Sequence, residues 1–466
     1  MARRDLAVPA RMSRVAVVAP RARLREALIA VADSRTVELV GPLAPPEGEE
    51  IEALRRLERR LPGTNAREPR LSREPPDVAV LERRGAHALL AGEVELRRRA
   101  SAAIHGGSFV GYVGWTPESE LGRLAVRLAP AGAAVVELPK PEWADPPTLL
   151  RTMRPARPFQ PLVETYGPAR YEDIDPTPFA AAAFVLMFGM MFGDAGQGPI
   201  LALLALALRR TRRQLVSVRS VWPLVFACGI SGTLFGLLYG QFFGPTGVVP
   251  ALWFDPLDDP VRLLVAALAV GAVLLACSYA IGTVNRWRER GFAAALVAPS
   301  GFAGSAVFLG GALLLAGWST QSTWLTVAGA IAIACGVLLL GLGFFLEAER
   351  GAAGAAQALV EVVDAVVRVG ASAISFARLA AFGLMHGALT AIVWEGTVAL
   401  WSGALALLAV ALFLAGNAGT FALEGLVAGV QALRLEYYEL FSRIFAGEGR
   451  PFSPWSIPLA TAEEES

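Results

Sequence analysis

The sequence predicts an α+β domain in its N-terminal part and an all-α polytopic membrane domain in the rest. The chain of 466 residues is 54% hydrophobic and 18% charged. Its mean hydropathy of +0.49 is too apolar for an ordinary soluble protein of this length. The charge is also uneven: residues 1–175 are rich in Arg, Glu, Asp and Pro, whereas charges beyond Pro178 are confined to short clusters.

The N-terminal part alternates apolar runs with amphipathic segments, as strands and helices do. The predicted strands are residues 14–20, 36–41, 109–115 and 134–139. The predicted helices are residues 21–32, 51–60, 89–103 and 117–128. Because the strands fall into two sets, each around a helix, we expect two small α/β lobes with a short helical arm between them.

Proline content and charge mark the predicted domain boundaries. Residues 1–138 are assigned to a cytoplasmic α/β domain, because the N-terminus lacks the apolar core of a signal peptide. The Pro-rich residues 139–175 are predicted to form a linker. Residues 176–455 are assigned to the membrane domain, and residues 456–466 to a C-terminal tail.

Long apolar stretches define the membrane domain, since a membrane-spanning helix needs about 20 apolar residues. They are residues 179–208, 220–243, 262–284, 296–318, 323–346, 357–394 and 402–436. The first is long enough for a hairpin and is interrupted at Gly193–Pro199. A hairpin returns the arginines at positions 209–219 to the side of the Arg-rich N-terminal domain, as the positive-inside rule requires. We therefore expect eight spans with both termini in the cytoplasm.

The last two apolar stretches are longer than a span requires. Each has on the order of 35–40 residues, or about 55–60 Å of helix, whereas the hydrocarbon core is about 30 Å thick. We expect two long helices that tilt strongly or project from the bilayer. Side by side, they would form a wall against a round neighbour.

Arg378 lies inside the first of these long stretches, where an ionisable residue is by default a functional candidate. At 100° per residue, Asp364, Ser375 and Arg378 fall close to one helix face. His386 follows Arg378 by two helical turns. These side chains predict a polar seam along an otherwise apolar helix.

The last stretch carries a second polar seam. Asn417, Glu424 and Gln431 recur every seven residues, and Arg434 follows one turn later. Two facing seams suit a hydrated half-path for an ion. A structural salt bridge between Arg378 and Glu424, or a histidine whose only role is packing, also fits the pattern. Asp194, in the break of the first stretch, fits a turn-former and an ion ligand equally.

The scarcity of lysine excludes several kinds of site. Lys140 is the only lysine, and it lies outside any Gly-Lys-Ser/Thr sequence, so a nucleotide-binding P-loop is absent. The net charge of +1 gives no indication of a nucleic-acid partner. We expect no catalytic residue, bound metal or cofactor in this chain.

Four motifs follow one another along the chain. They are Ile174–Phe179 with Phe188–Gly196, then Pro250–Pro260, then Ser375–His386, and finally Leu423–Gly425 with Gln431–Leu435 and Phe445–Pro454. In this order they resemble the membrane stator subunit of V-type and A-type rotary ATPases, called subunit a or subunit I (the 116 kDa family). The N-terminal domain is shorter than is usual in that family.

The resemblance implies an eight-span domain of the cell (inner) membrane that lies beside a ring of proteolipid subunits. Arg378 would face the carboxylate of each ring subunit, and Glu424, His386 and Arg434 would line two proton half-channels. Gln431, Asp364 and Ser375 are further matches to the proton path. The implied partners are the proteolipid ring, membrane lipid and, through the N-terminal domain, the peripheral stalks. The alternatives are a self-contained ion-coupled transporter and a structural anchor.

Overall fold

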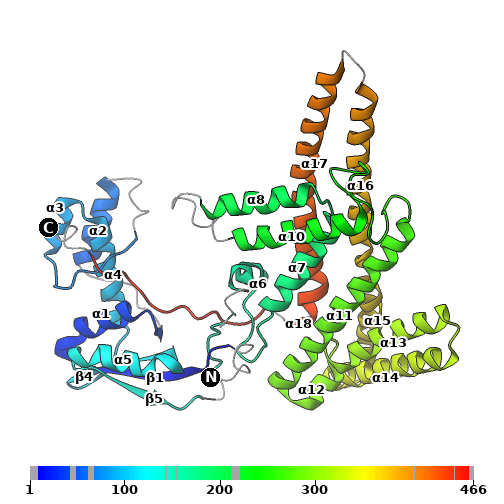
Figure 1. Cartoon of the computed structure of the whole chain (residues 1–466). Helices are drawn as coiled ribbons and strands as arrows, with labels where there is room; N and C mark the ends of the chain where they lie inside the picture. The colour runs from blue at the N-terminus through cyan, green and yellow to red at the C-terminus, as the bar shows by residue number, and fades with distance from the viewer. Residues whose placement is uncertain are drawn as a thin grey trace. The chain divides into compact units, whose positions relative to one another are not determined.

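The computed structural model describes residues 9–41, 49–60, 68–141, 144–150, 152, 156–210, 221–401, 405–445 and 447–460. These residues divide into two compact units. One unit contains the described residues of Pro9–Leu150 and Gly449–Ser466. The other contains those of Arg151–Glu448 (Figure 1).

The first unit is built on one antiparallel sheet. Its strands are β1 (Met12–Pro20), β2 (Glu38–Val40), β3 (Ile104–Gly106), β4 (Phe109–Pro117) and β5 (Ala134–Leu138). Their order is β2-β4-β1-β5, with β3 added to β4. Alternate residues of β1 (Val15, Val17 and Ala19) are buried. Val17 and Ala19 share a core with helices α1 (Leu24–Ser34) and α5 (Leu121–Leu128).

The sheet confirms the predicted strands but not their division into two lobes. Strand β1 pairs with β4, as in Val17 with Tyr112, and also with β5, as in Val17 with Val135. Both predicted sets therefore belong to a single βαββαβ sheet of ferredoxin-like order. Local patterning predicts each strand, but the pairing of β1 with strands about 100 residues later is a tertiary choice that leaves no local signal.

The predicted helical arm lies between β2 and β3. It consists of α2 (Glu49–Arg60), α3 (Val78–Arg84) and α4 (His87–Ser101). A small apolar core joins them, formed by Ala53, Leu57, Leu81, Leu89 and Leu90. The arm is therefore a compact three-helix insertion.

The C-terminal residues pack into the first unit, which the sequence analysis did not predict. Trp455 donates its backbone N–H to Val37 (2.9 Å), and Leu459 forms a parallel bridge with Leu71. Arg450 forms an ion pair with Glu38, whose carboxylate also accepts the backbone N–H of Ser453. The Trp455 side chain is 7% exposed.

The second unit is almost entirely helical. Its helices are α6 (Gln160–Tyr166), α7 (Thr177–Met191), α8 (Gln197–Arg209), α10 (Trp222–Tyr239), α11 (Pro260–Arg290), α12 (Phe292–Val297), α13 (Phe302–Ser319), α14 (Thr323–Glu347), α15 (Ala352–Ser375), α16 (Ala377–Leu400), α17 (Ala406–Leu435) and α18 (Ser442–Ile444). A π-helical turn, Glu436–Phe441, joins the last two.

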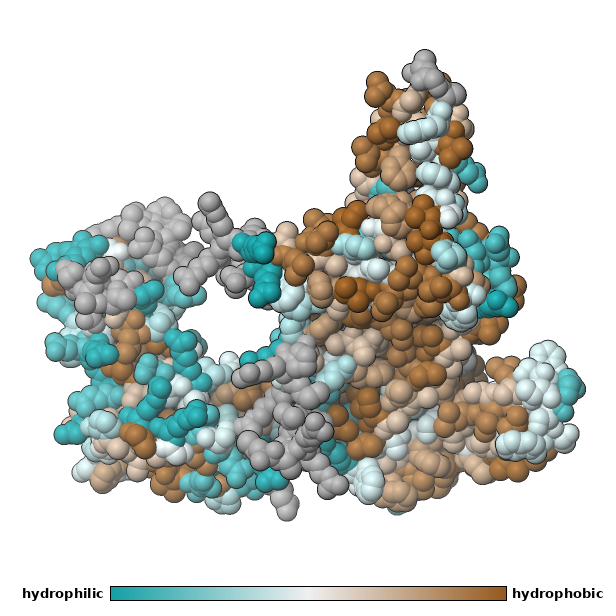
Figure 2. All heavy atoms as spheres, viewed as in Figure 1, coloured by the Kyte–Doolittle hydropathy of each residue, from teal (hydrophilic) through white to brown (hydrophobic). Residues whose placement is uncertain are grey.

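Five helical segments of the described chain are long and apolar enough to cross a membrane. They are Trp222–Tyr239, Pro260–Arg290, Phe292–Ser319, Thr323–Glu347 and Ala406–Ile444. Helices α7 and α8 are apolar but shorter, with 15 and 13 residues. Hydrophobic residues dominate the visible surface of this unit, with hydrophilic residues among them (Figure 2). The count of eight spans and the sides of the loops stay predictions.

The structure interrupts two of the apolar stretches near their middle. The first break, between Met191 and Gln197, was predicted. The prediction of one long helix over residues 357–394 is wrong, because α15 and α16 meet at Phe376. There the N–H groups of Phe376 and Leu379 bond to carbonyls three residues earlier, which tightens the turn. The buried Phe376 ring packs directly against Gly271. A Cβ atom at position 271 would lie only 2.2 Å from this ring.

Candidate functional site

Helices α16 and α17 run side by side and carry most of the polar residues singled out in the sequence (Figure 1). The structure sorts these residues into two separate places on the helix pair. One is a buried triad of Asp194, His386 and Glu424. The other is an open arginine groove around Arg378.

The buried triad centres on the ring of His386. His386 Nδ1 hydrogen-bonds Glu424 Oε2, and His386 Nε2 lies 3.8 Å from Asp194 Oδ2. The three residues are 2%, 3% and 0% exposed for His386, Glu424 and Asp194 respectively. A histidine between two carboxyl groups can take a proton from one and give it to the other.

Asp194 is held in place by the backbone around it. Its carboxylate accepts N–H groups from Gly196 (2.7 Å), Gln197 (2.8 Å), Phe243 (3.1 Å) and Gly244 (3.1 Å). The first two begin α8, where N–H groups lack helical partners. Asp194 is thus a turn-former and a member of the triad at once. Its sequence signal is a carboxylate in the break of an apolar stretch.

Two buried amides extend the triad along α17. Gln197 Nε2 donates to Asn417 Oδ1 (3.2 Å), and both side chains are buried. Asn417 lies seven residues before Glu424, and both side chains are buried. Gln197 was not among the predicted site residues, because its position beside α17 depends on tertiary packing.

The arginine groove is lined by Ser375, Arg378, Arg434, Tyr438 and Glu439, around a cavity of about 590 Å³. Arg378 lies 3.6 Å from Glu439, and its Nε donates to the Ser375 carbonyl (3.0 Å). The side chains of Arg378 and Glu439 are 25% and 12% exposed. The Arg378 guanidinium therefore faces an open cavity that has room for water, and its ion pair with Glu439 is weak.

The structure does not contain the salt bridge between Arg378 and Glu424 that the sequence analysis offered as an alternative. Glu424 contacts His386, whereas the ion pair of Arg378 is with Glu439. Glu439 was not among the predicted site residues. It lies in the π-helical turn after α17, whose wider turn shifts the face on which a residue falls. The period of 3.6 residues per turn of an α-helix therefore could not predict the face on which Glu439 lies.

Asp364 lies elsewhere, on the wall of a polar cavity of about 600 Å³. It forms an ion pair with Arg368 one turn along α15. Arg443 lines the same cavity, is 6% exposed and donates to Ser372 Oγ (2.8 Å). Gln431, partly buried, lines neither the arginine groove nor this cavity.

Comparison with known proteins decides the family. Residues 106–244 match the model of the "V-type ATPase 116kDa subunit family". The chain belongs to this family. It is 27% identical to the A-type ATP synthase subunit I of Thermococcus kodakarensis over 73% of this chain and 53% of the relative. It is 30% identical to that of Aeropyrum pernix over 69% of this chain and 52% of the relative.

A third relative in the same family is subunit I of the A-type ATP synthase of Halobacterium salinarum. It is 29% identical over 67% of this chain and 52% of the relative. This chain thus spans about half the length of these relatives of the 116 kDa subunit family.

Proposed function

We propose that this chain is the membrane stator subunit of an A/V-type rotary ATPase or ATP synthase and carries protons to and from a proteolipid ring. The observation that carries the proposal is the position of Arg378. It lies on a helix pair, in an open groove, weakly paired with Glu439, and His386 of the sealed triad lies eight residues further along the same helix.

An arginine in such a groove can act only through its charge. Its guanidinium stays protonated in proteins, so it does not relay a proton itself. The fixed positive charge favours the ionised form of any carboxyl group that approaches it. A ring carboxyl reaching Arg378 would therefore release its proton, and Glu439 would hold the arginine between visits.

The two polar sites supply candidate half-paths. The triad of Asp194, His386 and Glu424 offers titratable groups in series within an apolar surrounding. The cavity near Asp364 offers room for water beside charged side chains. Separation matters, because one elementary charge crossing 100 mV gives up about 2.3 kcal/mol. Arg378 keeps an ion from passing straight between the paths.

The remaining predictions follow from this role. His386, Glu424 and Arg434 are assigned to the proton path, with Gln431, Asp364 and Ser375 as further members. The partners are the proteolipid ring, peripheral stalk subunits bound by the first unit, and membrane lipid. The chain is placed in the cell membrane with both termini cytoplasmic.

Substitution of Arg378 tests the proposal in the assembled complex. In Arg378→Lys we expect a drop of at least roughly tenfold in ATP-driven proton uptake by vesicles, equivalent to about 1.4 kcal/mol, because a lysine ammonium is a shorter-reaching point charge that can lose its proton. The complex should still co-purify with the proteolipid ring. Proton uptake at the wild-type rate would refute the role of Arg378.

A self-contained ion-coupled transporter is the competing function. It predicts ion movement by this chain alone in vesicles, without a proteolipid ring. The proposed role predicts no transport under these conditions and recovery when the ring is supplied. A structural anchor predicts that Arg378→Ala leaves transport intact whenever the complex assembles.

A further inference from the structure

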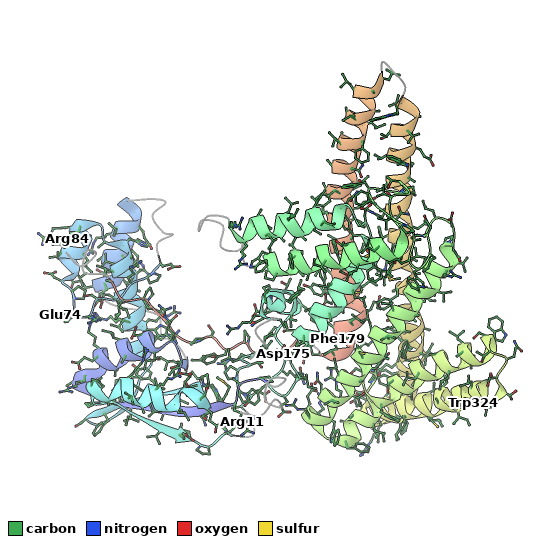
Figure 3. The ribbon with its side chains drawn as sticks, in the orientation of Figure 1. Arg11, Glu74, Arg84, Asp175, Phe179 and Trp324 are labelled. Atoms are coloured by element: carbon green, nitrogen blue, oxygen red, sulfur yellow. The ribbon has the colours of Figure 1, made fainter. Side chains whose placement is uncertain are left out.

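The polar cavity of about 600 Å³ in the second unit contains a cluster of arginines. Its wall is formed by residues of α11, α12, α14, α15 and α18 and by Arg170. Glu347, the last residue of α14, lines it, and Trp324, labelled in Figure 3, marks the opposite end of that helix. The arginines of the wall are Arg170, Arg286, Arg290, Arg368 and Arg443.

Arg443 is the most deeply buried of these arginines, at 6% exposed. It donates to Ser372 Oγ (2.8 Å) and to the Arg368 carbonyl (3.4 Å), and it lies 5.2 Å from the ring centroid of Tyr279. All three groups are neutral. Within the described residues Arg443 forms no ion pair with a carboxylate, and its Nε–H has no acceptor. Because a buried charge without a counter-ion is costly, an anion in the cavity would stabilise Arg443.

The other charges of the wall do not supply this anion. Three arginines have carboxylate partners of their own: Arg170 with Glu448, Arg286 with Glu289, and Arg368 with Asp364. None of the acidic residues of the wall is buried: Glu347, Glu361, Asp364 and Glu448. Arg290 is exposed and, like Arg443, forms no ion pair within the described part of the chain. Arg443 and Arg290 are therefore the positive charges available to a ligand.

The surroundings of the two arginines are apolar, as an amphiphilic ligand requires. Val297, Leu340 and Phe344 line the same cavity. Where α11 meets α12, Trp287 and Phe292 are 58% and 66% exposed. Exposed aromatic rings next to arginines are typical of the membrane–water interface. The predicted topology puts this end of α11 on the cytoplasmic side, where the leaflet carries anionic lipids.

We propose that this cavity binds the phosphate group of an anionic phospholipid, with Arg443 as the buried counter-charge and Arg290 at the exposed side. A guanidinium can donate two parallel N–H groups to phosphate oxygens. Basic pockets between membrane helices on the cytoplasmic side suit lipid headgroups, and the apolar wall suits acyl chains. A free phosphate ion shares the charge but lacks the chains. The lipid site stands whether or not the cavity also carries protons.

Lipid binding by the purified chain, without a proteolipid ring, tests the site. Native mass spectrometry in detergent would compare phosphatidylglycerol with phosphatidylcholine of the same chain length. We expect phosphatidylglycerol to bind at least roughly tenfold more tightly, because unpaired arginines favour an anionic headgroup. Inorganic phosphate and glycerol phosphate should bind at least roughly tenfold more weakly than phosphatidylglycerol, because they bury no apolar surface.

Substitutions place the lipid in the cavity. Arg443→Gln should weaken phosphatidylglycerol binding at least roughly tenfold, because it removes the buried charge that pairs with the phosphate. Arg290→Gln should weaken it roughly fivefold, since Arg290 is exposed. Arg288→Gln is the matched control, because Arg288 is also exposed near the end of α11 but does not line the cavity. The control should bind within roughly twofold of wild type.

If Arg443→Gln does not fold, the comparison of Arg290→Gln with Arg288→Gln decides. The proposal is overturned if wild type does not prefer phosphatidylglycerol, or if these two variants weaken binding equally. It is also overturned if inorganic phosphate binds as tightly as the lipid. Because neither the ring nor proton flux enters these measurements, such a result would leave the proposed role of Arg378 untouched.

Discussion

The buried triad and the arginine groove lie on the same helix, eight residues apart, yet they are built in opposite ways. In the triad, His386 and two carboxyl groups are sealed from solvent and bonded to one another or to backbone. In the groove, Arg378 has one ion pair at 3.6 Å and faces an open cavity. The groups of a sealed network stay bonded to one another, whereas an open, weakly paired charge can interact with another charged group that approaches it.

This difference distinguishes a stabilising role from a role in activity, which the sequence alone does not distinguish. Both sites are charges in apolar helices, and both are costly for the fold. The triad stabilises its charges within the chain, so its loss should reduce stability. The groove leaves Arg378 incompletely paired, so its loss should reduce activity with little effect on stability. The following substitutions measure each side of this contrast.

Arg378→Ala should produce the largest effect on activity. We expect ATP-driven proton uptake by the assembled complex to fall by at least roughly a hundredfold, or about 2.7 kcal/mol. The unfolding free energy should change by less than about 1 kcal/mol, as for other exposed ion pairs. Vesicle uptake and chemical unfolding check the two halves. A large loss of stability would place Arg378 with the triad instead.

Glu424→Ala should produce a large loss of stability. It leaves His386 buried beside Asp194 without its closest partner, and breaking a buried pair costs about 3–5 kcal/mol. Chemical unfolding in detergent measures the change. Glu395→Ala on α16 is the control, because Glu395 is exposed and should change stability by less than about 0.5 kcal/mol. Equal effects of the two variants would contradict the sealed triad.

Asp194→Ala should destabilise the chain more than Asp194→Asn, and both should be less stable than the wild type. The alanine variant removes the acceptor of four backbone N–H groups, and an orphaned buried donor costs about 1–3 kcal/mol. The asparagine variant keeps one acceptor oxygen. The order of the three thermal midpoints tests the double role of Asp194. If Ala and Asn variants melt together, its backbone contacts contribute nothing.

Glu439→Gln should give the smallest effect. The pair with Arg378 is partly exposed, so its loss should change the unfolding free energy by less than about 1 kcal/mol. Proton uptake should change by a few-fold at most, because Arg378 remains. A change as large as that of Arg378→Ala would make Glu439 an equal partner in the groove.

The contrast also shows which parts of this site a sequence can reveal. Periodicity and charge placed Arg378, His386 and Glu424 on two apolar helices, and the structure keeps them there. Glu439, the partner of Arg378, was not predicted because a π-helical turn moves it to another helix face. Gln197 escaped because only packing of α8 against α17 brings it to Asn417. The pairing of strands that are distant in sequence, such as β1 and β5, likewise depends on tertiary packing and was not predicted.

The C-terminal residues woven into the first unit impose an order on the making of this protein. Glu38 and Val37 are synthesised early, whereas their partners Arg450 and Trp455 follow the helices of the second unit. Roughly 300 residues separate Leu150 from Gly449. At about 5–20 residues per second, translation of this interval takes roughly 15–60 seconds. The first unit therefore stays incomplete until helix α17 has been made, and only a chain synthesised past Leu459 can close it.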